Sequence, residues 1–277
     1  MKLALQGFNV VQVAFGRNFL GAIALLMVML IMRRSLKMSW SQLGHTAVVS
    51  VFFNVFPALL YAWAQTGISS GLASIYNATT PIMTLLVTAL AFRTQRSNRY
   101  QNSGVALGLL GVLVIAVPEV GLGGAWPLHL ACLGATACYG VGYVYLRQFL
   151  ARPDADPIQQ TATQLTIASC ILAPLLIWAP VPQDFLNPTA WFGLSMLGVV
   201  GTGLCYVWNN KLIGLWGASR AAMTTYVTPA VGVLLGAMFL AEPLVWNLFA
   251  GLAIVLLGIV LSGYRPAMKN KPVESIR

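Results

Sequence analysis

The sequence predicts an all-α polytopic membrane protein, built as an inverted-topology repeat of five-helix units. Three observations lead there. First, 58% of the residues are hydrophobic and only 8% are charged, a composition typical of polytopic α-helical membrane proteins. Second, the apolar runs are continuous and do not alternate with polar residues, which argues against a β-barrel. Third, two of these runs, in opposite halves of the chain, share one pattern around a central proline.

Each predicted span is long enough to cross a bilayer or nearly so, since a crossing takes about 20 apolar residues. The connections between the runs are short, so no separate catalytic domain is expected. The nine predicted spans are Val10–Met32, Gly44–Gln65, Ser70–Phe92, Asn102–Pro118, Pro127–Leu146, Pro157–Ala179, Ala190–Asn210, Ser219–Leu240 and Leu244–Tyr264.

Basic residues gather in every second connection, and the other connections hold no lysine or arginine. By the positive-inside rule, the basic connections and the C-terminus face the cytoplasm. The net charge of +10 therefore reflects membrane orientation and not nucleic-acid binding. We expect a multi-pass protein of the plasma membrane (a bacterial inner membrane), with the lipid bilayer as its surroundings. The basic residues that set this orientation are Arg33, Arg34, Lys37, Arg93, Arg96, Arg99, Arg147, Arg152, Lys211, Arg220, Arg265, Lys269, Lys271 and Arg277.

Two helices with a mid-span proline are the strongest pointer to a binding site. Pro81 and Pro229 each remove a backbone donor and bend their helix. Inside a bilayer such a break is tolerated where protein or a wet cavity satisfies the freed carbonyl. Paired broken helices in the two halves of a chain mark midplane sites in many secondary transporters.

The two halves align as repeats. Pairs at offsets of 145 to 148 residues are Arg17 with Gln164, Tyr61 with Tyr206, Gln65 with Asn210, Asn77 with Thr225, and Pro81 with Pro229. Five spans separate the partners, and because five is odd the second copy is inverted. We expect a first repeat over residues 1–122 with four spans, a second over 123–265 with five, and a cytoplasmic tail over 266–277. The missing partner of the span at Pro127 suggests that one N-terminal helix is absent from this chain.

These motifs resemble the EamA-type exporters of the drug/metabolite transporter superfamily. The resemblance rests on the VAFGR run ending at Arg17, on ASIYNATTP and AAMTTYVTP, on AEP with Glu242, and on the glycines that follow each. It implies ten helices in two repeats, and export of amino acids or other small metabolites. The first-half counterpart of Glu242 falls near Gln95, which departs from the acidic residue usual in that family and argues against a paired-carboxylate role.

The candidate substrate-binding residues combine a buried cation, aromatic rings, hydroxyls and amides. Arg17 either faces a cavity, where it would attract a carboxylate, or extends to the lipid headgroups. The tyrosines line the path or pack in the core, since interfacial tyrosines are common. An apolar cavity with a few such polar groups suits an amphipathic solute. The full set is Arg17, Tyr61, Gln65, Tyr76, Asn77, Pro81, Tyr139, Tyr143, Gln164, Tyr206, Asn210, Thr225, Tyr226 and Pro229.

Other function classes fit less well. No HExxH or GxSxG motif and no aspartate occurs in a central span, so we expect no enzyme, catalytic residue, metal or cofactor. The four cysteines lack CxxC spacing and are expected to be small core residues. The remaining alternative is a proton-driven multidrug or organic-cation efflux transporter; a nucleotide-sugar exchanger would need more cavity lysines. We expect a small-molecule substrate, no nucleic-acid partner, and a monomer or homodimer.

Overall fold

The computed structural model describes residues 1–35, 37–91, 100, 103–104, 106–108, 110–111, 114, 126–151, 155–182, 184–240 and 246–263. These residues form helices and connections, with no strand among them. The α-helices are α1 (Val10–Ile31), α2 (Trp40–Ser50), α3 (Phe56–Ala64), α4 (Ser70–Asn77), α5 (Thr80–Ala91), α7 (Trp126–Phe149), α8 (Pro157–Leu172), α9 (Pro188–Ser195), α10 (Cys205–Trp216), α11 (Ala218–Ala222), α12 (Val227–Leu240) and α13 (Trp246–Gly263). Short 3-10 segments lie at η1 (Ala4–Gln6), η3 (Ala173–Trp178) and η5 (Met223–Tyr226), and π-helical segments at η2 (Val51–Val55) and η4 (Met196–Leu204).

The prediction of an all-α polytopic membrane protein is confirmed. Within the described residues, five helical segments are long and apolar enough to cross a bilayer: Val10–Ile31, Trp40–Ala64, Ser70–Leu90, Pro157–Trp178 and Pro188–Trp216. Large apolar side chains on these segments are exposed, as in Ile31, Leu90 and Ile177. An apolar surface of this kind is stable in contact with lipid, whereas in water it would promote aggregation.

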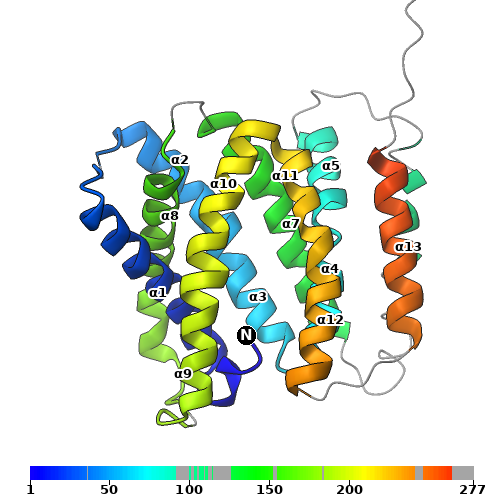
Figure 1. Cartoon of the computed structure of the whole chain (residues 1–277), viewed down its shortest axis with the longest axis horizontal. Coiled ribbons are helices and arrows are strands. Elements are labelled where there is room, and N and C mark those ends of the chain that lie inside the picture. The colour runs from blue at the N-terminus through cyan, green and yellow to red at the C-terminus, as the bar shows by residue number, and fades with distance from the viewer. Residues whose placement is uncertain are drawn as a thin grey trace, which may run out of the picture.

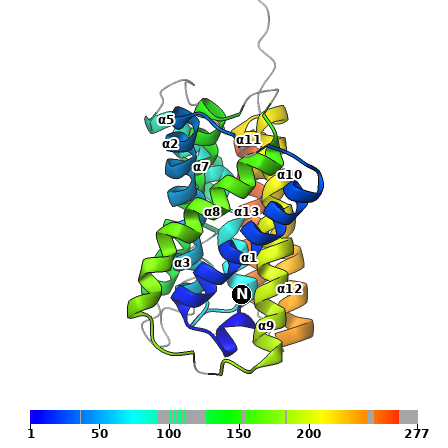
Figure 2. The same cartoon turned by 90° about the vertical axis from the view of Figure 1, so that its left-hand side faces the viewer.

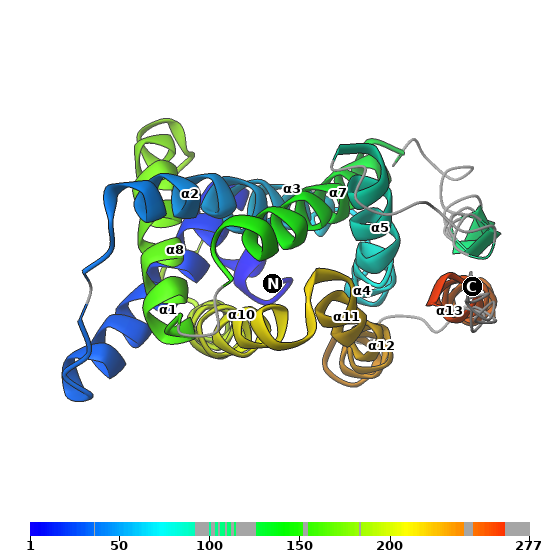
Figure 3. The same cartoon turned by 90° about the horizontal axis from the view of Figure 1, so that it is seen from above.

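The helices pack side by side in one elongated bundle (Figure 1). Seen from above, α1, α2 and α8 form one end, α13 lies at the other end, and α7 and α10 run through the middle (Figure 3). The helices α1 and α8 are inclined to each other and pack together (Figure 2). On its other side the bundle is held by contacts of α7 with α3 and α5, and of α4 with α12. Helix α7 therefore occupies the centre, and side chains along it face both halves of the chain.

Two predicted boundaries were wrong, and one predicted span is largely outside the described residues. The second span begins at Trp40 and not at Gly44, because Ser39 and Gln42 form a capping box that starts the helix earlier. The seventh span does not end at Asn210; α10 continues to Trp216 and stops at Gly217, whose φ of +86° suits a glycine helix terminus. The predicted span Asn102–Pro118 is described only at scattered helical positions.

The cysteine prediction holds in part. Cys132 is a buried core residue, as expected, but Cys170 and Cys205 are exposed. A weakly polar thiol is compatible with an apolar exterior, so position within a hydrophobic span does not place a cysteine in the core. The described cysteines are free thiols.

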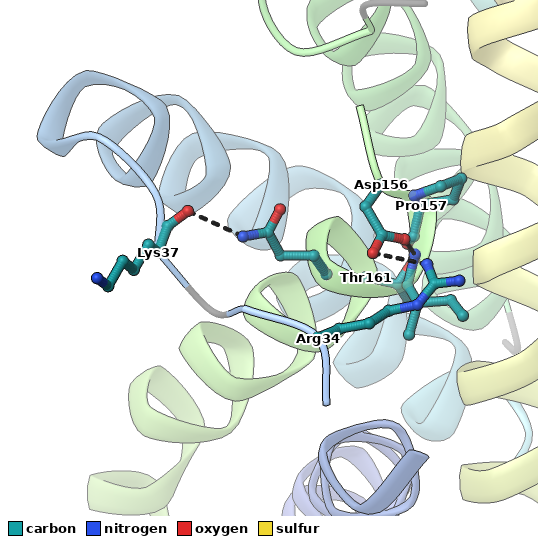
Figure 4. Close-up of polar contacts among 7 residues, drawn as sticks. Arg34, Lys37, Asp156, Pro157 and Thr161 are labelled. Carbon is teal, nitrogen blue, oxygen red and sulfur yellow. Dashed lines mark hydrogen bonds and ion pairs between the residues drawn. The ribbon is translucent and has the colours of Figure 1, made fainter. Parts of the chain in front are cut away.

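The α1–α2 connection is tied to the start of α8 by polar contacts (Figure 4). Arg34 Nη1 donates to Asp156 Oδ2 at 2.7 Å, while Asp156 Oδ1 caps α8 by accepting from the Ile158 backbone N–H at 3.0 Å. Gln159 Nε2 donates to the Lys37 carbonyl at 2.9 Å. Exposed ion pairs of this type contribute under about 1 kcal/mol, so these contacts define the path of the connection more than they stabilise the bundle.

Candidate functional site

An aromatic cluster surrounds the middle of α7. Phe53, from the π-helical segment η2, contacts three tyrosine rings edge-on, with centroid distances of 5.3 Å to Tyr139, 5.0 Å to Tyr143 and 5.5 Å to Tyr206. Tyr61 of α3 also lies near Tyr139, with the two ring centroids 6.1 Å apart. Such edge-to-face contacts add to the stability of the packed rings. The residues of this aromatic cluster come from four elements: α3, α7, α10 and η2.

A cavity of about 440 Å³ opens beside this cluster, within the size range of small-molecule pockets. On one wall, the Tyr143 hydroxyl donates to Asn209 Oδ1 at 2.9 Å. Residues equivalent in the two repeats line the same cavity: Asn77 with Thr225, and Thr80 with Thr228. The lining residues are Phe53, Asn77, Thr80, Tyr139, Tyr143, Leu204, Cys205, Tyr206, Trp208, Asn209, Leu212, Thr224, Thr225 and Thr228.

A second cavity, of about 230 Å³, lies next to the first and contains Arg17. The two cavities share Asn77, Tyr139 and Thr228. The lining of the second cavity is more polar, with serine, amide and guanidinium groups: Met1, Arg17, Tyr61, Gln65, Ser70, Ala73, Ser74, Asn77, Tyr139, Leu197 and Thr228. The predicted residues Arg17, Tyr61, Gln65, Asn77 and Tyr139 thus meet in one place.

Arg17 is buried, with 7% of its surface exposed. Its Nε donates to Thr202 Oγ1 at 3.0 Å, and the Thr202 hydroxyl in turn donates to the Leu197 carbonyl at 2.8 Å. The acidic residues in the described part of the chain are Asp156 and Asp184, and neither pairs with Arg17. The guanidinium is therefore held by one neutral partner on a cavity wall, with no carboxylate from the described residues to neutralise it. A buried cation of this kind favours an anionic ligand.

Both proline-containing helices are interrupted where the sequence predicted. Pro81 has no N–H for the Asn77 carbonyl, and α4 ends at Asn77 with α5 starting at Thr80. The Thr80 hydroxyl donates to that freed carbonyl at 2.6 Å. In the second half a 3-10 segment, η5, separates α11 from α12 just before Pro229. Each break places polar groups beside the cavities.

Replacing Thr80 with valine should destabilise the protein by about 1–3 kcal/mol, because the Asn77 carbonyl would lose its donor inside the bundle. Thr88→Val is the matched control. The Thr88 hydroxyl donates to the Thr84 carbonyl at 2.7 Å on the same helix, and there the backbone ladder is uninterrupted. Thermal unfolding in detergent measures both. Equal losses for the two variants would contradict the role assigned to Thr80.

Some predicted residues lie outside these two cavities. Tyr76 is buried, with its hydroxyl 2.8 Å from His129 Nδ1. Gln164 and Asn210 are also buried and bond to each other at 2.9 Å, at the contact between α8 and α10. Pro81 and Pro229 are buried and lie just after the helix breaks. The Tyr226 side chain, like Glu119, Glu242 and Gln95, lies outside the described residues.

The sequence prediction also missed several lining residues. Thr80 and Thr228 precede the two prolines, so the repeated Thr-Pro pair was a usable signal. The lining residue Phe53, and Thr202 which bonds to Arg17, lie on π-helical segments. Such segments are common at functional sites, and these two occur at equivalent places in the two repeats, starting at Val51 and Met196. The described residues contain no cluster of histidine, cysteine, aspartate or glutamate that could hold a metal ion.

The sequence and the fold have counterparts among known proteins. The sequence profile of the EamA-like transporter family matches residues 1–117 and 126–264. The chain belongs to the EamA-like transporter family. It is therefore a multi-pass membrane transporter, and the resemblance noted in the sequence is confirmed.

Relatives agree with this assignment. An uncharacterized transporter of Bacillus subtilis, YvbV, is 28% identical over 255 residues, which cover 88% of this chain and 79% of that protein. A probable amino-acid metabolite efflux pump of Salmonella typhimurium is 27% identical over 235 residues, covering 80% and 77%. One solved crystal structure has the same fold, with a TM-score of 0.66 at 18% identity, covering 91% of this chain and 88% of the other.

Proposed function

We propose that this EamA-like transporter exports small amphipathic metabolites that carry a carboxylate, most simply amino acids or related compounds. The observation that carries the proposal is Arg17: a buried guanidinium on a cavity wall, with no carboxylate partner among the described residues. A ligand carboxylate would supply the missing negative charge through two N–H donors. The name of the Salmonella relative, a probable amino-acid metabolite efflux pump, points to the same class of substrate.

The second part of the proposal is alternating access. The repeats, 1–122 and 123–265, would rock against each other at the breaks before Pro81 and Pro229, closing one side of the cavities as the other opens. Small residues allow the helices to approach closely. A Cβ on Gly232 of α12 would clash with Ser74 of α4, and a Cβ on Gly258 of α13 would lie 2.6 Å from the Gly104 carbonyl oxygen. The basic connections and the C-terminus would face the cytoplasm of a bacterial cell.

The alternative is a proton-driven multidrug or organic-cation transporter. The aromatic walls of the larger cavity support it, because aromatic rings bind cations through their π faces. Against it stands the charge of Arg17, which repels a cation. Proton coupling within a membrane also commonly uses an acidic group inside a span. Among the described residues, Asp156 lies at the start of α8 and Asp184 in the α8–α9 connection.

Solute counterflow in proteoliposomes distinguishes the two functions. Vesicles would be loaded with unlabelled L-phenylalanine or tetraphenylphosphonium and supplied with the same labelled compound outside, with and without a pH gradient. We expect accumulation of L-phenylalanine without a gradient. Accumulation of tetraphenylphosphonium alone, and only with a gradient, would contradict the proposal and support the cation antiporter.

A further inference from the structure

The two cavities meet at one aromatic side chain. Tyr139 lines both, and it packs against two separate hydrophobic clusters, one containing Tyr61 and the other containing Phe53 and Tyr143. Its hydroxyl lies 3.2 Å from the hydroxyl of Tyr206, either of which can donate, and Tyr206 also bonds to the Phe53 carbonyl at 3.4 Å. The ring is thus held at its tip and packed between two hydrophobic clusters.

Asn77 and Thr228 also lie at the boundary between the cavities. These two residues come from the interrupted helices of the two repeats, and each lines both cavities. Asn77 is positioned by the Tyr61 and Thr80 hydroxyls, which lie 3.4 Å and 3.3 Å from its Oδ1. The residues shared by the two cavities are therefore one large ring and two short polar side chains.

The two cavities differ in chemistry. The smaller one holds Arg17 with Ser74 and Gln65, groups that suit the charged end of an amphipathic molecule. The larger one is walled by Phe53, Tyr143 and Trp208, with Asn209 as an amide, and suits an apolar or aromatic body. Tyr139, Asn77 and Thr228 line both cavities, so a molecule with its carboxylate at Arg17 and its other end in the larger cavity would lie against these three residues.

We propose that the cavities are two subsites of one binding site, an anion subsite at Arg17 and an aromatic subsite beside Tyr143, and that Tyr139 is the partition that sets substrate length. The inference rests on the proposed function, because it assumes a carboxylate at Arg17. With the ring in place, a single amino acid fits with its carboxylate in the anion subsite. Without the ring the connection between the two subsites widens, and longer molecules can extend through both.

The test is a change in selectivity, which a purely structural role of Tyr139 would not produce. Counterflow of labelled L-alanine, a short probe, is compared with that of L-alanyl-L-phenylalanine, a long probe. Tyr139→Ala should raise the ratio of long-probe to short-probe rates by about tenfold. Tyr139→Phe keeps the ring and loses only the bond to Tyr206, so its ratio should stay within about threefold of the wild-type value.

Two further variants keep the test decisive. Tyr139→Leu replaces the ring with a shorter apolar side chain and should raise the ratio even if the alanine variant does not fold. Tyr145→Phe is the matched control, because Tyr145 lies on the same helix and bonds to His45 at 2.9 Å, away from both cavities. A folded Tyr139→Leu or Tyr139→Ala protein that transports L-alanine with an unchanged ratio would overturn the partition alone. Wild-type protein that transports neither these probes nor L-phenylalanine would overturn the proposed function as well.

Discussion

Arg17→Ala is expected to lower counterflow of L-phenylalanine by about 100-fold or more. Removing one partner of a charge-assisted contact between a buried guanidinium and a carboxylate costs about 3 kcal/mol or more of binding free energy. Each 1.4 kcal/mol corresponds to a factor of ten in affinity. The side chain is 7% exposed and lines the smaller cavity, so solvent screens the contact little. Initial counterflow rates at equal protein per vesicle measure the effect.

Two variants separate charge from geometry. Arg17→Lys keeps the positive charge but loses the planar fork that binds a carboxylate through two parallel bonds, so we expect an intermediate rate. Arg34→Ala removes an exposed arginine in the α1–α2 connection, where it pairs with Asp156, and should transport at nearly the wild-type rate. If Arg17→Ala retained wild-type transport, the anion subsite would be excluded.

Gly140→Ala should destabilise the bundle strongly. A Cβ at position 140 would lie 2.8 Å from the Met83 carbonyl carbon and 3.0 Å from both the Met83 carbonyl oxygen and the Thr84 nitrogen. These are backbone atoms of α5, so no side-chain rotation can relieve the clash, and α5 and α7 must separate. Overpacking of this type costs about 1–3 kcal/mol or more, and Gly140 adjoins Tyr139, so the cavities would be distorted too.

Gly134 is the matched control on the same helix. A Cβ there meets only Leu60 Cδ1, at 3.5 Å, which is ordinary van der Waals contact with a flexible side chain. Gly134→Ala should therefore unfold at about the wild-type temperature in detergent, or slightly above it, because alanine favours the helix. Similar unfolding temperatures for the two variants would contradict the close approach of α5 and α7.

The main features of the fold could be predicted because they follow from local chemistry. Long apolar runs require membrane helices, and the missing N–H of Pro81 and Pro229 requires a break one turn earlier, where α4 and η5 end. Arg17 could be singled out because a charged side chain inside a membrane span is energetically costly and is commonly functional. The division into repeats at residues 122 and 123 remains a prediction.

The details of the site could not be predicted, because they depend on which way a side chain faces. Asn209 and Asn210 are neighbours on α10, and successive residues of a helix point about 100° apart. The alignment of the repeats selected Asn210, which bonds to Gln164, while Asn209 lines the larger cavity. Phe53 was missed because the π-helical segment that carries it has no distinct sequence signature, and such a segment shifts the register of the helix face.

The most direct test of the account is a thermodynamic cycle between Arg17 and the substrate carboxylate. Competition of L-phenylalanine counterflow by unlabelled L-phenylalanine and by 2-phenylethylamine, which lacks only the carboxylate, would be measured for the wild type and for Arg17→Lys, the variant expected to keep an intermediate rate. We expect the wild type to prefer the amino acid to the amine by about 100-fold and the variant to lose at least a factor of ten of this preference. An unchanged preference in the variant would show that Arg17 does not bind the carboxylate.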